Sequence, residues 1–330
     1  MLQFVADQID QLDLALDQLS VNDRNFDRFA MMLIDNVVEL TLHKYAREKS
    51  HENAFLSHGT NSKNNPKDVT DALGQSFDAK VKLARSTGMI SASVAESIQY
   101  LHGFRNVVYH QGRKHEVILH SLAILYFQHA CTVLENFKPA WWSSSGKDQI
   151  SYRAIKYLGD TKRLNIETLL PIASARLLLA CNSFGKSLIQ DLTSDMDETI
   201  TNIDDMIDFL ATDSPEPTSR NHAIVNLQVW PFAFSEAGKK WAHEHGCPKL
   251  KFTDYIEWLT KNYPWQIKSD PIVGWNKRCK SLRNEKDFDA ALKKYCDFMR
   301  QTEGFRDVIQ DSAYQLDAHI QNQIDEYRGK

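Results

Sequence analysis

The stretch FDAKVKLARSTGMISASVAESIQYLHGFRNVVYH, residues 77–110, decides the fold of the first half of the chain. It predicts one helix that ends at Gly88 and a second that starts after serine caps and ends at His110. Glycine is favoured where a helix ends, and serine where one begins. We therefore expect two consecutive helices, at about 71–87 and 91–110.

Helical periodicity continues on both sides of this stretch. Residues 2–19 carry apolar side chains at spacings of three and four, the repeat of a helix with one buried face: Val5, Ile9, Leu12, Leu16 and Leu19. Similar patterns predict helices at 26–49 and 115–137, with a Ser- and Asn-rich loop at 50–70. Five helices with mostly short connections predict a compact helical bundle over residues 1–137.

The composition of the 330-residue chain also favours helices, because only 13 glycines and 9 prolines interrupt it. The length predicts two domains. The segment KPAWWSSSGKDQ holds Pro, a serine run and Gly, so we expect a linker at 138–150. Residues 151–330 then form a second, mostly helical domain.

Two segments of the second domain predict a small β component. Residues 223–230 partly alternate between polar and apolar side chains, and residues 266–273 look extended. Together with the helices expected between them, they favour a module that resembles a winged helix. The expected fold class is therefore all-α with a small β element.

Charge and cysteine content bear on the expected partners and on the cellular compartment. The net charge of −4 lacks the basic excess of a non-specific nucleic-acid coat, so any such contact must use a local patch. Five dispersed cysteines indicate reduced thiols. No apolar run approaches the length of a membrane span, so we expect a cytoplasmic protein with no membrane contact.

The expected helix over 91–110 ends in Arg105-Asn106-Val107-Val108-Tyr109-His110, a set of side chains suited to phosphate chemistry. Arginine clamps phosphate oxygens with a fixed charge, and histidine transfers protons near neutral pH. Asn106 can orient either side chain. Arg105 and His110 differ by about 140° around a helix, yet a long arginine can reach across. The alternative is a capping histidine with a surface arginine.

These residues resemble the motif of the HEPN family of helical ribonuclease domains, in which an arginine and a polar residue precede a histidine by four to six positions. Residues 77–110 resemble the family's helical layout as well. Asp35, Asn36 and Glu39 match its habit of polar residues inside the second helix. The resemblance covers about residues 1–137.

The resemblance implies metal-independent cleavage of RNA without a cofactor. His110 would transfer a proton with the 2′-hydroxyl, Arg105 would hold the phosphate, and Asn106 would orient one of them. The products would be a 2′,3′-cyclic phosphate and a 5′-hydroxyl. The family implies a homodimer with both motifs in one cleft, a toxin or anti-phage role, and an inhibitory or activating partner. The second domain would select RNA, sense a trigger or hold the enzyme inactive.

Glu39 and Tyr109 are possible supporting residues. Glu39 would contact the Arg105 and His110 cluster from the facing helix, unless a neighbouring cation neutralises it. Tyr109 would stack on a base or shape the cleft, unless it packs in the core or an interface. We expect His102, three residues before Arg105, to have no role in the site.

Basic residues of the second domain are candidates for nucleic-acid binding, with a solvated charged face as the alternative: Lys239, Lys240, Lys249, Lys251, Lys277 and Arg278. His243 and Cys247 are one turn apart, but Gly246 and Pro248 break that helix and no second ligand pair follows, so we expect no metal site. No Gly-rich phosphate loop and no G-x-S-x-G elbow occurs. The runner-up function is a non-catalytic helical module that binds RNA, a nucleotide or a protein.

Overall fold

The computed structural model describes residues 1–56, 64–111, 117–139, 142–143, 145, 147–159, 166–184, 188–214 and 217–329. Within these ranges, the side chains of residues 56, 108–111 and 166–167 are not described.

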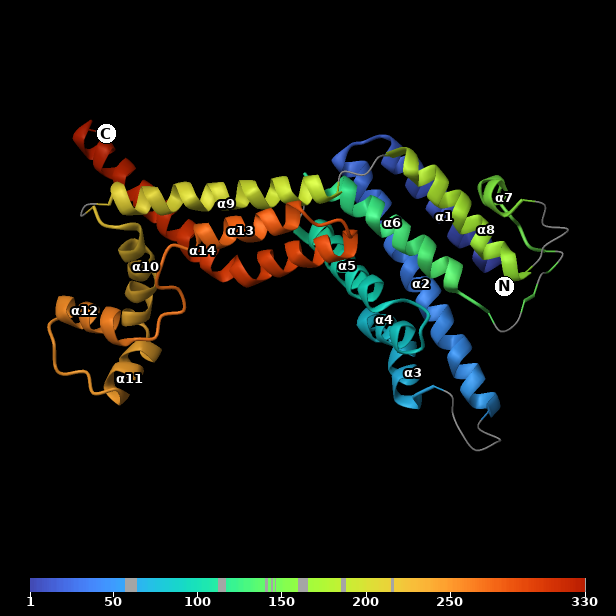
Figure 1. The fold of residues 1–330 in the computed structure, drawn as a ribbon, viewed down its shortest axis with the longest axis horizontal. Helices are drawn as coiled ribbons and strands as arrows, with labels where there is room; N and C mark the ends of the chain where they lie inside the picture. Colours follow the sequence, from blue (N-terminus) through green and yellow to red (C-terminus); the bar gives the residue numbers. More distant parts are fainter. Residues whose placement is uncertain are drawn as a thin grey trace. The chain divides into compact units, whose positions relative to one another are not determined.

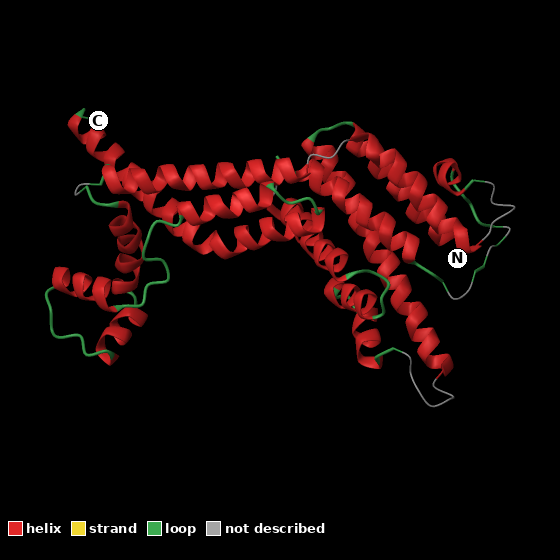
Figure 2. Ribbon diagram, in the orientation of Figure 1, coloured by secondary structure: helices red, strands yellow, loops and turns green. Residues whose placement is uncertain are grey.

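Every regular element among these residues is helical (Figure 2), which confirms the all-α class. The expected β segments are wrong. Residues 223–230 lie inside α10 (Arg220–Phe234), which starts where Ser219 accepts a hydrogen bond from the His222 N–H. The apparent alternation is also compatible with a helix, and α10 buries Ala223, Val229 and Ala233. Residues 266–271 have no regular structure and precede α13 (Ile272–Arg283), so the described residues provide no β element for a winged helix.

The chain divides into two compact units, Met1–Leu192 with Glu285–Lys293, and Thr193–Asn284 with Lys294–Lys330. The helices of the first unit, in chain order, are α1 (Leu2–Ser20), α2 (Arg24–Leu56), α3 (Pro66–Leu73), α4 (Phe77–Ser86), α5 (Ala92–Gln111), α6 (Leu119–Asn136), α7 (Tyr152–Leu158) and α8 (Ile166–Cys181). α2 is central, because it packs against α1, α3, α4, α5 and α6 (Figure 1).

The one expected helix at 71–87 is two helices. α3 ends at Leu73, and Ser76 then caps α4 by accepting a hydrogen bond from the Ala79 N–H. A serine at the N-cap favours a new helix start over continuation. The described residues of the expected linker at 138–150 belong to the first unit, where the Met1 ammonium and the Leu2 N–H both donate to the Ser143 carbonyl.

The second unit contains α9 (Leu188–Thr212), which begins in the first unit, α10, α11 (Glu236–Glu244), α12 (Phe252–Asn262), α13 and most of α14 (Phe288–Tyr327). Helices α9, α13 and α14 lie side by side (Figure 1). The Tyr295 hydroxyl on α14 donates to Asp195 on α9, and the Trp275 ring on α13 packs edge-on against Phe298 on α14.

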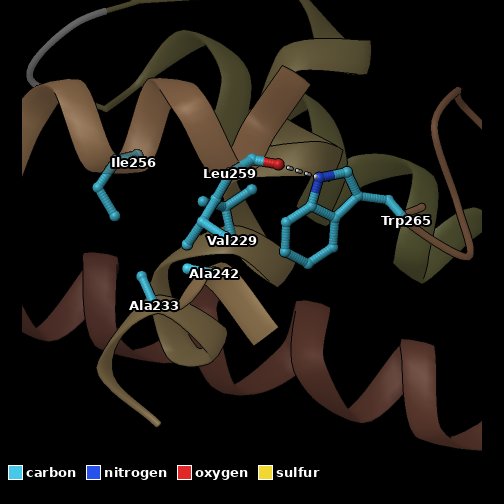
Figure 3. Close-up of a cluster of buried hydrophobic side chains, with 6 residues drawn as sticks. All are labelled: Val229, Ala233, Ala242, Ile256, Leu259 and Trp265. Atoms are coloured by element: carbon cyan, nitrogen blue, oxygen red, sulfur yellow. Dashed lines mark hydrogen bonds between the residues drawn. The ribbon is translucent and has the colours of Figure 1, made fainter. Parts of the chain in front are cut away.

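Helices α10, α11 and α12 form a separate small module around a buried cluster: Val229, Ala233, Ala242, Ile256, Leu259 and Trp265 (Figure 3). The Trp265 indole N–H donates to the Leu259 carbonyl at 3.2 Å, which satisfies the polar atom of a buried ring. This module therefore has a core of its own.

No single described helix is both long and apolar enough to cross a membrane, although residues 168–184 and 188–212 pass the same length and composition test as a bent pair.

Candidate functional site

A buried carboxylate, Asp35 on α2, lies at the centre of a polar cluster in the first unit. Its side chain is only 2% exposed. The Tyr126 hydroxyl on α6 donates to Asp35 Oδ1 at 2.6 Å, and His102 Nδ1 on α5 lies 2.8 Å from the same oxygen. Such a carboxylate is costly to bury without partners, so these contacts fix α2, α5 and α6 around one point.

Arg105 completes this cluster. Its Nε lies 3.4 Å from Asp35 Oδ2, and its Nη1 donates to the Asn106 Oδ1 at 2.9 Å. The guanidinium thus has an ion pair with a carboxylate and a hydrogen bond to an amide. Because the Arg105 side chain is still 32% exposed, solvent reaches it. An arginine oriented in this way is arranged in advance to bind an anion.

Two aromatic rings support the cluster. The His102 ring stacks on Phe77 of α4, with 3.8 Å between centroids and 7° between planes. Tyr126 is fully buried, and burial together with the nearby Asp35 carboxylate raises its pKa well above the ordinary value. Tyr126 is therefore a hydrogen-bond donor to Asp35 at any physiological pH. His102, which we expected to have no role in the site, belongs to the cluster.

His110 lies in the last turn of α5, five residues after Arg105. The side chains of His110 and Tyr109 are outside the described residues, so their predicted roles stay predictions. The backbone of α5 does continue without a break from His102 through His110.

Glu39 lies one turn after Asp35 on α2, and its ion pair is with Lys80 of α4 at 3.3 Å. The Lys80 side chain is 3% exposed, whereas Glu39 is 38% exposed. Lys80 is therefore the neighbouring cation that neutralises Glu39, and the carboxylate beside Arg105 is Asp35.

His43 follows Glu39 by one turn on the same helix. Burial lowers its pKa, and the positive charges of Lys80 and Arg47 lower it further, against a smaller opposite effect of Glu39. His43 is therefore neutral near pH 7, beside a row of charged groups at four-residue spacing: Asp35, Glu39 and Arg47 on α2.

The lowered pKa of His43 predicts acid sensitivity. The unfolded chain binds a proton at the His43 ring more readily than the folded chain does. The contribution of His43 to the free energy of unfolding is therefore present above the unfolded pKa of about 6.5 and is lost as pH falls through the folded pKa. We expect His43→Gln to reduce the loss of unfolding free energy between about pH 7 and pH 5. Urea unfolding at several pH values measures this, with His51→Gln, an exposed histidine on α2, as the control. An unchanged pH dependence in His43→Gln would contradict the assignment.

The basic candidates of the second unit have different surroundings. Lys239 pairs with Glu236 at 2.8 Å, and Lys240 lies 3.9 Å from Glu244. Arg278 lies over the Phe298 ring, and burial lowers its pKa, whereas Lys277 is exposed. Lys249 and Lys251 are exposed and make no ion pair with other described residues. These two lysines are the better candidates for phosphate contacts.

His243 and Cys247, weighed above as metal ligands, both lie among the described residues. Among the described residues, no group of three or more His, Cys, Asp or Glu side chains could hold a metal ion. Nearby, the His245 ring stacks on Trp241 with centroids 3.9 Å apart.

No model of a known protein family matches the sequence, and comparison with curated proteins and with solved structures gives no match.

Proposed function

We propose that the protein is a metal-independent endoribonuclease of the HEPN type, with its site at the C-terminal end of α5. Arg105 binds the scissile phosphate, and Asn106 orients Arg105 through the hydrogen bond between them. His110 accepts the proton of the RNA 2′-hydroxyl, whose oxygen attacks the adjacent phosphorus. The bond to the 5′-oxygen breaks and that oxygen takes up a proton, leaving a 2′,3′-cyclic phosphate and a 5′-hydroxyl.

The observation that carries this proposal is the fixed position of Arg105. The guanidinium forms an ion pair with the buried Asp35 and donates a hydrogen bond to the neighbouring Asn106, and the side chain remains partly exposed. A merely solvated surface arginine needs neither contact. An oriented cation stabilises charge that builds on the phosphate oxygens without reorganising during the reaction.

The proposal includes a homodimer in which the motifs of two chains line one cleft. It also includes a role as a toxin or anti-phage effector, controlled by an inhibitory or activating partner, and an RNA-selecting, trigger-sensing or inhibitory role for the second domain. The resemblance of residues 1–137 to the HEPN family is the support for these parts. The molar mass of the purified protein in solution tests the dimer.

A non-catalytic module that binds RNA, a nucleotide or a protein is the second candidate. One observation favours it: Arg105 and His102 both contact Asp35, and such contacts also serve to hold helices together.

Sequencing of RNA ends after induced expression separates the two candidates. We expect wild type to generate new 5′-hydroxyl ends in cellular RNA and His110→Ala to generate none. Equal sets of ends in the two strains would exclude the nuclease and leave the binding module.

A further inference from the structure

One face of α10 carries side chains that its own module does not bury. His222, Asn226, Trp230 and Phe234 follow one another at four-residue spacing, so they share one side of the helix. Trp230 is 45% exposed and Phe234 is 62% exposed. The neighbouring Val229 and Ala233 enter the buried cluster of the module instead (Figure 3). The packing of α10 in its module therefore uses Val229 and Ala233 and not this exposed face.

Phe252, the first residue of α12, joins the two exposed rings. Its centroid lies 5.7 Å from that of Trp230 and 5.0 Å from that of Phe234, and it is itself 43% exposed. We call Trp230, Phe234 and Phe252 the aromatic surface. Exposed aromatic rings in contact with one another are typical of binding sites, because a ligand that covers their apolar surface releases the water around them.

Positive charge lies beside the aromatic surface. Lys251 immediately precedes Phe252, and Lys249 lies two residues earlier; both are exposed and make no ion pair with other described residues. Lys239 pairs with Glu236, and the exposed Asp254 lies in the first turn of α12, where the helix dipole stabilises a carboxylate. Aromatic rings with adjacent lysines suit a ligand that has flat rings and negative charge.

Trp230 also lines a cavity of about 500 Å³, together with Thr218, His222, Asn226 and Leu316. The Asn226 side chain has a carbonyl that accepts and an amide that donates hydrogen bonds, as the edges of nucleobases require. The cavity, whose lining is mixed polar and apolar, and the aromatic surface thus meet at Trp230.

We propose that the aromatic surface, with Lys249 and Lys251, binds single-stranded nucleic acid. Bases stack on Trp230, Phe234 and Phe252, phosphates contact the two lysines, and one base enters the cavity toward Asn226. That the nucleic acid is RNA rests on the proposed ribonuclease function.

Binding of a fluorescein-labelled, 2′-O-methylated single-stranded RNA of about twelve nucleotides to the full chain, followed by fluorescence anisotropy, tests this proposal. The probe has no free 2′-hydroxyl, so it is not cleaved. We expect Trp230→Ala and Phe252→Ala each to weaken binding by about fivefold to a hundredfold, and Trp230→Phe to retain most of it. Tyr314→Ala, an isolated ring 76% exposed on α14, is the matched control and should bind as wild type.

The lysines have a separate signature. The double variant Lys249→Ala, Lys251→Ala should make the negative slope of log affinity against log salt concentration shallower by about 1.4, the value for two lost phosphate contacts on a single strand. Circular dichroism of each variant checks that the helices are retained. A slope equal to that of wild type would contradict the role of the lysines.

Three results would overturn the proposal. The first is no binding of the probe by wild type, and the second is equal binding by wild type and Trp230→Ala. The third is a Trp230→Ala variant whose oligomeric state changes while its affinity for the RNA probe does not. The last result would identify the aromatic surface as a self-association face. Failure here is separable from failure of the proposed nuclease. Cleavage that needs His110, together with probe binding that does not need Trp230, overturns the surface alone, whereas probe binding that needs Trp230 without any cleavage overturns the nuclease alone.

Discussion

Replacing His110 by alanine is expected to lower the rate of RNA cleavage by about a hundredfold to ten-thousandfold, the range for loss of a positioned acid or base. Arg105→Ala should cause a comparable loss, because the substitution removes its oriented charge. Arg105→Lys should remain impaired, since an ammonium cannot keep both the Asp35 and the Asn106 contacts in the planar geometry of a guanidinium. Single-turnover cleavage of a labelled RNA measures these rates.

Two exposed residues of the same unit serve as controls for these variants. His51→Ala on α2 and Arg85→Ala on α4 remove the same side-chain types away from the Asp35 cluster and should cleave as wild type. Cleavage at the wild-type rate by both His110→Ala and Arg105→Ala would rule out the proposed site. If the control variants lost as much of the cleavage rate as the site variants, the loss would reflect the overall charge of the protein and not the proposed site.

Asp35→Ala is expected to destabilise the first unit by about 3–5 kcal/mol, the cost of breaking a buried charged network by removing one partner. The change leaves the buried Tyr126 hydroxyl and His102 Nδ1 without their acceptor and removes the carboxylate beside Arg105. Urea unfolding, with the denaturant slope compared between variants, measures the loss.

Asn36→Ala is the matched control for Asp35→Ala, because Asn36 is the next residue on α2 and is exposed, with a solvent-exposed hydrogen bond to Gln11 on α1. Exposed substitutions of this kind usually change stability by about 0.5 kcal/mol or less. A loss in Asp35→Ala no larger than that in Asn36→Ala would show that the Asp35 cluster does not hold α2, α5 and α6 together.

Much of the helical bundle could be predicted from apolar spacing alone. The stripe of residues 2–19 is α1, and residues 91–110 are α5 to within one residue at each end. These predictions succeed because a helix with one buried face leaves a strong periodic pattern. The polar residues noted inside the second expected helix do lie on α2, and one of them, Asp35, is buried among partners.

The partners within the site could not be predicted in the same way. Asp35 and Glu39 lie one turn apart on α2, and only the packing of α4 and α5 decides that Asp35 faces Arg105 while Glu39 pairs with Lys80. Tyr126 fits the apolar pattern of its helix, so its hydroxyl contact with Asp35 left no signal in the spacing. One contact of the site did leave a signal in the sequence: His102 and Arg105 are three residues apart and therefore share a face of α5.

The second unit shows where local patterns mislead. The alternation at 223–230 predicted a strand, yet the Ser219 cap and the burial of α10 against α12 favour a helix there. The lysines were equivalent in the sequence, but Glu236 and Glu244 lie one helical turn from Lys239 and Lys240 and leave Lys249 and Lys251 for other contacts. Tertiary packing decides the first case, whereas the lysine pairs are local, three and four residues apart on α11.

The chemical nature of the cut ends tests the central claim most directly. A purified full chain is incubated with a labelled RNA in excess chelator, and the two new ends are identified. We predict a 2′,3′-cyclic phosphate and a 5′-hydroxyl, no cleavage at a linkage whose 2′-oxygen is methylated, and no cleavage by His110→Ala. Ends that carry a 5′-phosphate, or cleavage that stops when divalent metal is removed, would contradict the mechanism assigned to Arg105 and His110.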